Sequence, residues 1–134
     1  MKYEEITLVP DAIHNRADPR HYMTIKTSQK FWLAKIEEHV LAKSHTAIEL
    51  KEVGVDIYPP VIYFPPNDVV TTLLKKNKKN TFCPLKGSTY YLDFFSNQTK
   101  ISDVAWVYEI TITEASKIQN MFAFDTSKVS LIYH

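Results

Sequence analysis

The sequence is poor in the residues that build several common kinds of site. Its 134 residues include one cysteine, Cys83, and two glycines, Gly54 and Gly87. A single cysteine excludes an intramolecular disulfide and a zinc site made of several thiolates. Phosphate-binding loops of the G-x-G-x-x-G or P-loop type need two glycines within a few residues, so neither type is present. A lone thiol suits a reducing compartment, and we expect a cytoplasmic protein.

The chain also lacks an excess of charge of one sign and a long apolar run. Sixteen Lys and Arg residues face 15 Asp and Glu residues, for a formal charge of +1. This balance leaves no basic footprint for nucleic acid, so we expect no nucleic-acid partner. No apolar run reaches the length of about 18 residues that a membrane-spanning helix needs, and we expect no membrane partner. Glu4, Glu5 and the absence of an apolar stretch argue against a signal peptide.

Residues typical of β-sheets are abundant. Eight Tyr, seven Phe and two Trp accompany many Val, Ile and Thr residues. Residues 48–51 alternate apolar and polar, as in a strand with one exposed face, and 61–64 lie between two Pro-Pro pairs that delimit a strand. Hairpins are predicted over 31–43 and 90–110. The fold class that follows is mainly β, with antiparallel sheets.

Two short helices are predicted beside the strands. Asn67 is a suitable N-cap for a helix over 68–75, of which 68–74 is the best supported part, and Thr113 for one over 114–120. The lysine cluster at 75–79 is predicted to be a solvated loop rather than a phosphate-binding patch, because no aromatic residue is interleaved with it.

Three motifs in the middle of the chain resemble those of one family. They are YPPVIYFPPNDV at 58–69, TFCPLKG at 81–87 and AWVYE at 105–109, with Tyr91 four residues after Gly87. This combination resembles the family catalogued as domain of unknown function 427, which carries C-P-x-K-G and W-x-Y-E motifs. The resemblance covers residues 21–132, so we expect a single domain over 1–134 in which 1–20 form an N-terminal extension.

The resemblance implies a compact antiparallel fold similar to the β-tent shared by methionine sulfoxide reductase B and the cereblon ligand-binding domain. Those relatives commonly hold zinc with two C-x-x-C pairs. Because this chain has one cysteine, we expect no metal and no other cofactor. The sequence departs from the family pattern at Tyr22, Thr111 and Asp125, so no ligand preference is carried over.

Cys83 has two interpretations. It is a nucleophile if Lys86 lowers its pKa and one of His21, His39 or His45 approaches as a base. It is otherwise a small buried apolar residue, which is the usual role of an isolated cysteine.

Lys86 is the strongest candidate for contact with a ligand. It lies between Pro84, which stiffens the loop, and Gly87, which permits a sharp turn. An ammonium held there can bind a phosphate or a carboxylate, or form a Schiff base if desolvated. In the structural alternative its stem packs over Trp106 and its head is solvated. A site role predicts that Lys86→Met costs within about 1 kcal/mol, and a buried ion pair predicts about 3–5 kcal/mol.

Four aromatic residues on strand-like segments are the candidate walls of a pocket. They are Tyr63, Tyr91, Trp106 and Tyr108. Trp106 and Tyr108 are two residues apart and therefore share a face of one strand. Such a set can line a small-molecule site or belong to the ordinary core, where each tyrosine hydroxyl finds a partner.

The sequence leaves two possible roles for each of three polar residues. Asp68 is either a residue in the first turn of a helix or a general base, and His21 is either a site group or a surface histidine. Glu52 either pairs with Lys86 or faces water. Metal-dependent nucleotidyl transfer is unsupported, because Asp103 is followed by Ala105 where the second carboxylate is needed.

The sequence therefore favours a small β-rich protein that binds an anionic or carbonyl-bearing molecule, with or without turnover. Lys86, Tyr63, Tyr91, Trp106 and Tyr108 are the predicted ligand-binding residues. Weak catalytic candidates are Lys86, Cys83, His21 and Asp68. The alternative is a non-enzymatic interaction or structural module with no ligand.

Overall fold

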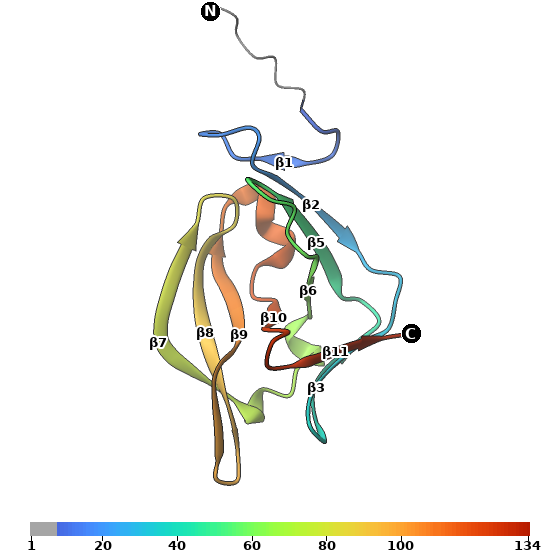
Figure 1. The fold of residues 1–134 in the computed structure, drawn as a ribbon, viewed down its shortest axis with the longest axis vertical. Coiled ribbons are helices and arrows are strands. Elements are labelled where there is room, and N and C mark those ends of the chain that lie inside the picture. The colour runs from blue at the N-terminus through green and yellow to red at the C-terminus, as the bar shows by residue number, and fades with distance from the viewer. Residues whose placement is uncertain (1–7) are drawn as a thin grey trace, which may run out of the picture.

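A computed structural model describes residues 8–134 as a mainly β protein (Figure 1). Residues 1–7, which include part of the predicted extension and of the segment that argued against a signal peptide, lie outside the described residues. The strands within 8–134 form three antiparallel sheets, which confirms the predicted fold class. The remaining regular elements are short 3-10 turns, and none of them is long and apolar enough to cross a bilayer.

The first sheet, here the N-terminal sheet, has the strand order β1-β2-β5-β6. Its strands are β1 (Ile13–His14), β2 (Tyr22–Thr27), β5 (Ile48–Val53) and β6 (Val61–Tyr63). The pairing of β1 with β2 joins part of the predicted extension to this sheet.

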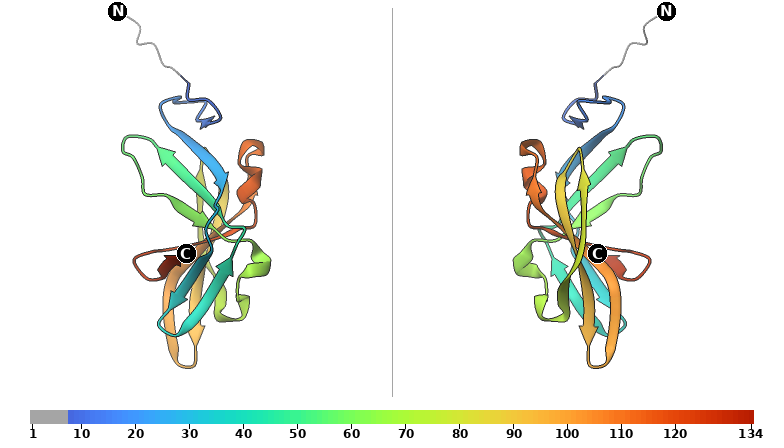
Figure 2. Two further views of the ribbon diagram at one scale, coloured as in Figure 1. Left: turned by 90° about the vertical axis from the view of Figure 1, so that its right-hand side faces the viewer. Right: turned by 90° about the vertical axis from the view of Figure 1, so that its left-hand side faces the viewer.

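The second sheet, here the long sheet, has the order β10-β9-β8-β7 and contains the longest strands. They are β7 (Leu74–Cys83), β8 (Gly87–Ser96), β9 (Thr99–Thr111) and β10 (Phe122–Phe124). The β8–β9 hairpin projects as the tip at the bottom of Figures 1 and 2. Phe64, directly after β6, exchanges backbone hydrogen bonds of 2.7 and 2.9 Å with Phe122 and so ties this sheet to the N-terminal sheet.

The third sheet, here the small sheet, has the order β11-β3-β4, with β3 (Trp32–Ile36), β4 (His39–Ser44) and β11 (Ser130–Tyr133). The tight turn between β3 and β4 passes through Glu37, which has a positive φ of 52°. Along β3, Trp32, Ala34 and Ile36 are buried while the residues between them are partly exposed, as the alternation of side chains in a strand requires.

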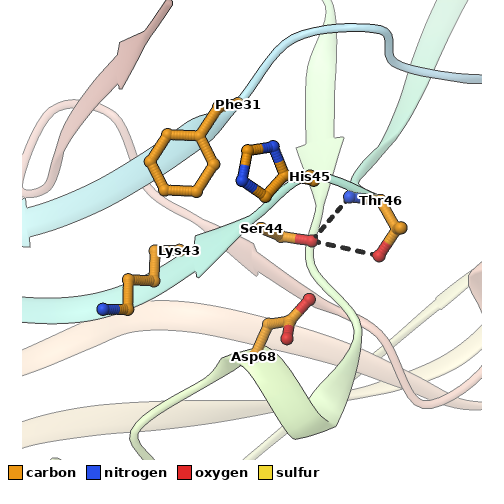
Figure 3. A pocket seen from close by; sticks show the side chains of 6 residues that line it. All are labelled: Phe31, Lys43, Ser44, His45, Thr46 and Asp68. Atoms are coloured by element: carbon orange, nitrogen blue, oxygen red, sulfur yellow. Dashed lines mark hydrogen bonds between the residues drawn. The ribbon is translucent and has the colours of Figure 1, made fainter.

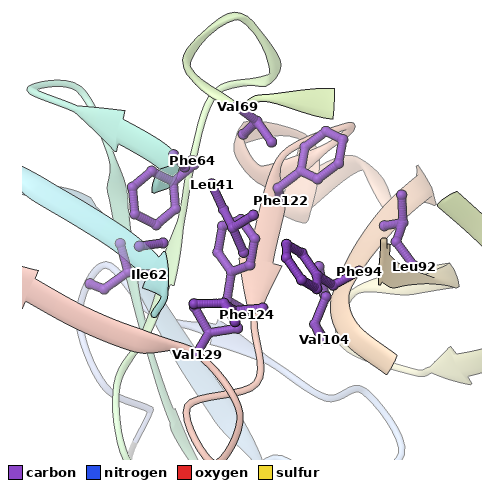
Figure 4. Packing of buried hydrophobic residues seen from close by; sticks show 14 of the residues in the cluster. Leu41, Ile62, Phe64, Val69, Leu92, Phe94, Val104, Phe122, Phe124 and Val129 are labelled. Carbon is purple, nitrogen blue, oxygen red and sulfur yellow. The ribbon is translucent and has the colours of Figure 1, made fainter. Parts of the chain in front are cut away.

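Two hydrophobic clusters lie on opposite faces of the long sheet. Phe122 and Phe124 of β10 belong to the first cluster, with Phe64 and Phe94 (Figure 4). Ala123, between them in sequence, belongs to the second cluster, with Met23, Leu50, Tyr63, Leu85, Tyr108 and Ile118. Because successive side chains of a strand point to opposite faces, β10 contributes residues to both hydrophobic clusters.

The prediction of short helices is confirmed, but their boundaries differ from the predicted ones. The structure has 3-10 turns at η1 (Pro66–Asp68), η2 (Thr71–Leu73) and η3 (Thr113–Ile118). Asn67 lies inside η1 rather than at its N-cap, and none of the three turns has a side-chain cap. Because Val69 to Thr72 are all β-branched, the segment resists a continuous helix, and Leu74 already begins β7.

The lysine cluster at 75–79 is predicted from the sequence to be a loop, but in the structure it is part of the edge strand β7. Lysine side chains on an edge strand protect its unpaired backbone from association with another sheet. Aromatic rings of β8 lie beneath three of them. The ammonium of Lys76 is 4.5 Å from the ring centre of Tyr90, that of Lys79 is 4.4 Å from Tyr91 and that of Lys75 is 5.8 Å from Phe95.

Candidate functional site

Lys86 lies in a tight turn that is fixed by backbone hydrogen bonds of both its amide and its carbonyl group. Residues 84–86 connect β7 to β8, and the amide of Lys86 donates to the carbonyl of Cys83 at 3.1 Å. The carbonyl of Lys86 accepts the amide of Ile112 at 3.0 Å. Gly87 follows with a φ of 129°, and a Cβ atom there would lie 2.0 Å from the carbonyl oxygen of Ile110. Glycine is therefore required at position 87, and the position of Lys86 depends on it.

The five predicted ligand-binding residues converge on one cavity of about 330 Å³, here the Lys86 cavity. Tyr91 of β8 and Trp106 of β9 are cross-strand partners, and Tyr108 lies two residues further along β9 on the same face. Tyr63 enters from β6, in the N-terminal sheet. Lys86 enters from the turn that begins β8. The cavity thus forms where the long sheet meets the N-terminal sheet.

Lys86, Glu52 and His21 form a hydrogen-bonded chain beside this cavity. The ammonium of Lys86 lies 2.7 Å from Oε1 of Glu52, and Nε2 of His21 lies 2.7 Å from Oε2. The side chains of Lys86 and Glu52 are only 11% and 18% exposed. On the far side of His21, Nδ1 is 3.2 Å from Nδ2 of Asn15. The open question about Glu52 is thus answered, since it pairs with Lys86 rather than facing water.

The environment keeps this ion pair charged. Burial acts to raise the pKa of the Glu52 carboxyl, but hydrogen bonds from Lys86 and His21 outweigh it and lower that pKa below its usual value. Burial acts to lower the pKa of Lys86, whereas the hydrogen bond to Glu52 and the negative charge of its carboxylate raise it above its usual value. A lysine that stays protonated is a hydrogen-bond donor and an electrostatic group, and it is poorly suited to Schiff-base formation.

The buried tyrosines of the cavity stay neutral. Burial raises the pKa of both Tyr63 and Tyr108 above the usual value for a phenol. The indole Nε1 of Trp106 donates a long hydrogen bond of 3.4 Å to the hydroxyl of Tyr63, and the ammonium of Lys86 lies 5.7 Å from the ring centre of Tyr108. The walls therefore offer aromatic surface together with neutral hydroxyl groups.

Four charged residues that sequence reasoning missed also line the Lys86 cavity. They are Lys79, Asp103, Asp125 and Lys128, which form two loose pairs. Lys79 lies 3.7 Å from Asp103, and Lys128 lies 3.8 Å from Asp125. Asp103 is three residues from Trp106 and would face away from it in a regular strand, but it has a positive φ of 53° next to a register shift between β8 and β9. This bulge turns the side chain of Asp103 toward the cavity, and no local sequence pattern predicts the bulge.

The bulge is held by a small polar network. The amide of Asp103 donates to Oδ1 of Asp93 at 2.9 Å. The side-chain amide of Asn77 donates to Asp93 at 2.8 Å and to Asp103 at 2.6 Å. Asn77 lies in the irregular stretch of β7 where its register with β8 shifts. Asn77 therefore joins the irregular stretch of β7 to the bulge of β9 across the intervening strand β8.

The weak catalytic candidates are not brought together in the cavity. Asp68 lines a separate hollow of about 450 Å³ with Phe31, Lys43, Ser44, His45 and Thr46 (Figure 3). Cys83 ends β7 and packs beside the second hydrophobic cluster. His21 reaches Lys86 only through Glu52.

The histidines proposed as partners of Cys83 are engaged elsewhere. Nε2 of His39 lies 3.2 Å from the hydroxyl of Ser96, and the ring of His45 lies 4.3 Å from that of Phe31. Across residues 8–134 no three His, Cys, Asp or Glu side chains converge as metal ligands. The groups that the cavity presents are Lys86, the neutral phenols, the indole and the four charged residues named above.

Comparison with known proteins gives one result for the family. A family model described as a domain of unknown function (DUF427) matches residues 24–134. No curated protein matches the chain. The matched region includes Lys86, Gly87 and every residue that lines the Lys86 cavity.

Proposed function

The chain belongs to the family described as domain of unknown function (DUF427), and on the geometry of its site we propose that it binds a small anionic or carbonyl-bearing molecule in the Lys86 cavity. One observation carries this proposal. Five residues from four separate segments line a single cavity, and a buried ammonium lies at its wall. Cavities that combine aromatic walls with charged groups in fixed positions are typical of small-molecule sites, and here four aromatic residues stand beside five charged ones.

The charge of Lys86 defines the chemical class of the ligand. Its ammonium has three N–H groups, and the contacts of residues 8–134 give it one acceptor, Glu52. Two donors remain for an oxygen in the cavity. Because the pKa of Lys86 is raised, the group is cationic at neutral pH and favours a carboxylate, a phosphate or a polarised carbonyl.

A titration of the full chain with acetate, inorganic phosphate and pyruvate tests the proposal. Binding is read from chemical-shift changes of the Trp106 indole N–H, which Trp106→Phe identifies by removing it. We expect at least one of these probes to bind. The double variant Lys86→Met/Glu52→Gln removes both charges of the pair without leaving either one buried alone. It should weaken that binding by about 1.5–3 kcal/mol, the range for a hydrogen bond to a charged group.

Lys43→Met is the matched control, because Lys43 is exposed and lines the separate Asp68 hollow. It should leave binding unchanged. If none of the probes binds, the proposal is wrong and an interaction or structural module without a ligand takes its place. If the double variant binds as well as the parent protein, Lys86 does not hold the ligand and the proposal is also wrong.

A further inference from the structure

A second hollow adjoins the Lys86 cavity at Trp106. It measures about 480 Å³, and its walls include Tyr58, Pro59, Pro60, Ile62, Phe124 and Leu131; we name it the apolar hollow. Val61, Trp106 and Asp125 line both spaces. The two spaces are thus neighbours with a common wall rather than separate features of the surface.

The lysine side chains line only one of the two spaces. All three lysines, Lys79, Lys86 and Lys128, line the Lys86 cavity, and none of them lines the apolar hollow. The Trp106 indole directs its N–H to the Tyr63 hydroxyl, in the wall of the Lys86 cavity. The surface that faces the apolar hollow is made mainly of proline, aromatic and aliphatic groups, which suits a flat apolar body.

The two carboxylates at the apolar hollow are already engaged. Both oxygens of Glu52 are bound, one by Lys86 and the other by His21, each at 2.7 Å. Oδ1 of Asp125 accepts the amide and the hydroxyl of Ser127 at 2.9 and 2.6 Å, and Oδ2 lies 3.8 Å from Lys128. Neither acid is therefore a free receptor for a cation, and the apolar surface determines what the hollow accepts.

Glu52 also shows how near the cationic group is. It lines the apolar hollow while its Oε1 atom lies 2.7 Å from the ammonium of Lys86. A ligand that extends past Trp106 from one space into the other would therefore place an apolar body in the apolar hollow and an anionic end in the Lys86 cavity.

We infer that the two spaces form one site for an amphipathic ligand, a flat apolar body that carries a single carboxylate. The body lies in the apolar hollow against Trp106 and Pro59, and the carboxylate accepts hydrogen bonds from Lys86. This inference rests on the proposed function, since it extends the ligand of the Lys86 cavity into the neighbouring hollow.

Three probes test the inference by titration of the full chain, with the Trp106 indole N–H as the readout. 2-Naphthoate carries both parts, acetate carries the carboxylate alone, and 2-naphthylmethylammonium carries the flat body with a positive end. We expect 2-naphthoate to bind at least tenfold more tightly than either of the others.

Two variants locate the parts of the ligand. Tyr58→Ala removes a wall of the apolar hollow and should weaken 2-naphthoate at least fivefold while acetate binding is unchanged. Tyr133→Ala is the control, because Tyr133 is similarly exposed, 53% against 44%, and lines neither space. Lys86→Met/Glu52→Gln should weaken both carboxylates.

The outcomes separate the two claims. Equal affinity for 2-naphthoate and acetate, with no effect of Tyr58→Ala, overturns the inference and leaves the proposed function intact. Tighter binding of the amine overturns the assigned orientation and with it the inference. Binding of 2-naphthoate that Tyr58→Ala weakens but the double variant does not would show that the apolar hollow acts alone, which contradicts a shared site. If no carboxylate binds, the inference is overturned, and the proposed function fails with it only when inorganic phosphate does not bind either.

Discussion

The Nζ atom of Lys86 and the Oε1 atom of Glu52 lie 2.7 Å apart and join the turn between β7 and β8 to strand β5 of the N-terminal sheet. Two sheets that share no strand are thereby connected at the wall of the Lys86 cavity. The pair has two consequences, because it fixes the direction of the ammonium and it leaves a buried charge behind when either partner is removed.

Lys86→Met should therefore lower the free energy of unfolding by about 3–5 kcal/mol, the cost of a buried ion pair rather than the small cost expected of a ligand contact alone, since it leaves the carboxylate of Glu52 buried with only His21 as partner. The double variant Lys86→Met/Glu52→Gln should lower the free energy of unfolding clearly less than Lys86→Met does, because it leaves no buried charge without a partner. Urea denaturation of the parent protein and both variants measures the two differences. A loss within about 1 kcal/mol for the single variant would mean that the pair contributes little to folding.

Gly87→Ala should destabilise the protein by at least about 2 kcal/mol, because the positive φ and the contact of 2.0 Å between the new Cβ and the Ile110 carbonyl both oppose it. Gly54→Ala is the matched control, since a Cβ there meets only side-chain atoms of His21 and Tyr58 at 3.4 Å or more. Thermal unfolding of both variants gives the comparison. Equal melting temperatures would contradict the assigned role of Gly87.

Acid should destabilise the protein in part through Asp93. Burial acts to raise the pKa of its carboxyl, but hydrogen bonds from the Asp103 amide and Asn77 lower it below its usual value. A lowered pKa in the folded state contributes stability that is present above the unfolded value of about 3.9 and is lost as the pH falls through the folded value.

Asp93→Asn should reduce the loss of folding stability at acid pH, because the variant has no carboxyl group to protonate at this position. Urea denaturation between pH 7 and pH 3 should show a smaller decrease of stability in the variant than in the parent protein. Asp56→Asn, at an exposed residue whose backbone oxygen accepts the Gly54 amide, is the control and should follow the parent profile. Parallel profiles for Asp93→Asn and the parent protein would exclude this role for Asp93.

Phe94→Ala should cost about 3–5 kcal/mol, because the side chain is 1% exposed within the first hydrophobic cluster and its removal leaves a cavity. Phe82→Ala, on the same sheet but 70% exposed, should stay within about 0.5 kcal/mol. Chemical denaturation measures both losses. A similar cost for the two variants would show that burial in the long sheet does not govern its stability.

Several features of the fold follow from local sequence alone. The prolines on either side of residues 61–64 delimit β6, and β-branched and aromatic residues favour strands wherever they alternate with polar ones. Trp106 and Tyr108 share a face because the period of a strand is two. The same local reasoning missed the boundaries of the 3-10 turns at Pro66–Asp68 and Thr71–Leu73, because an N-cap residue alone does not sustain a helix through β-branched positions.

The sequence by itself determined the members of the aromatic set and the loop that carries Lys86, because Pro84 and Gly87 constrain backbone angles whatever surrounds them. Only the tertiary structure decided the rest. Glu52 became the partner of Lys86 because two sheets meet at that point, and a pairing across 34 positions leaves no local trace. Asp103 entered the cavity through a bulge. Asp68 lies in a separate hollow, because the chain after β6 turns toward β4 rather than toward Lys86.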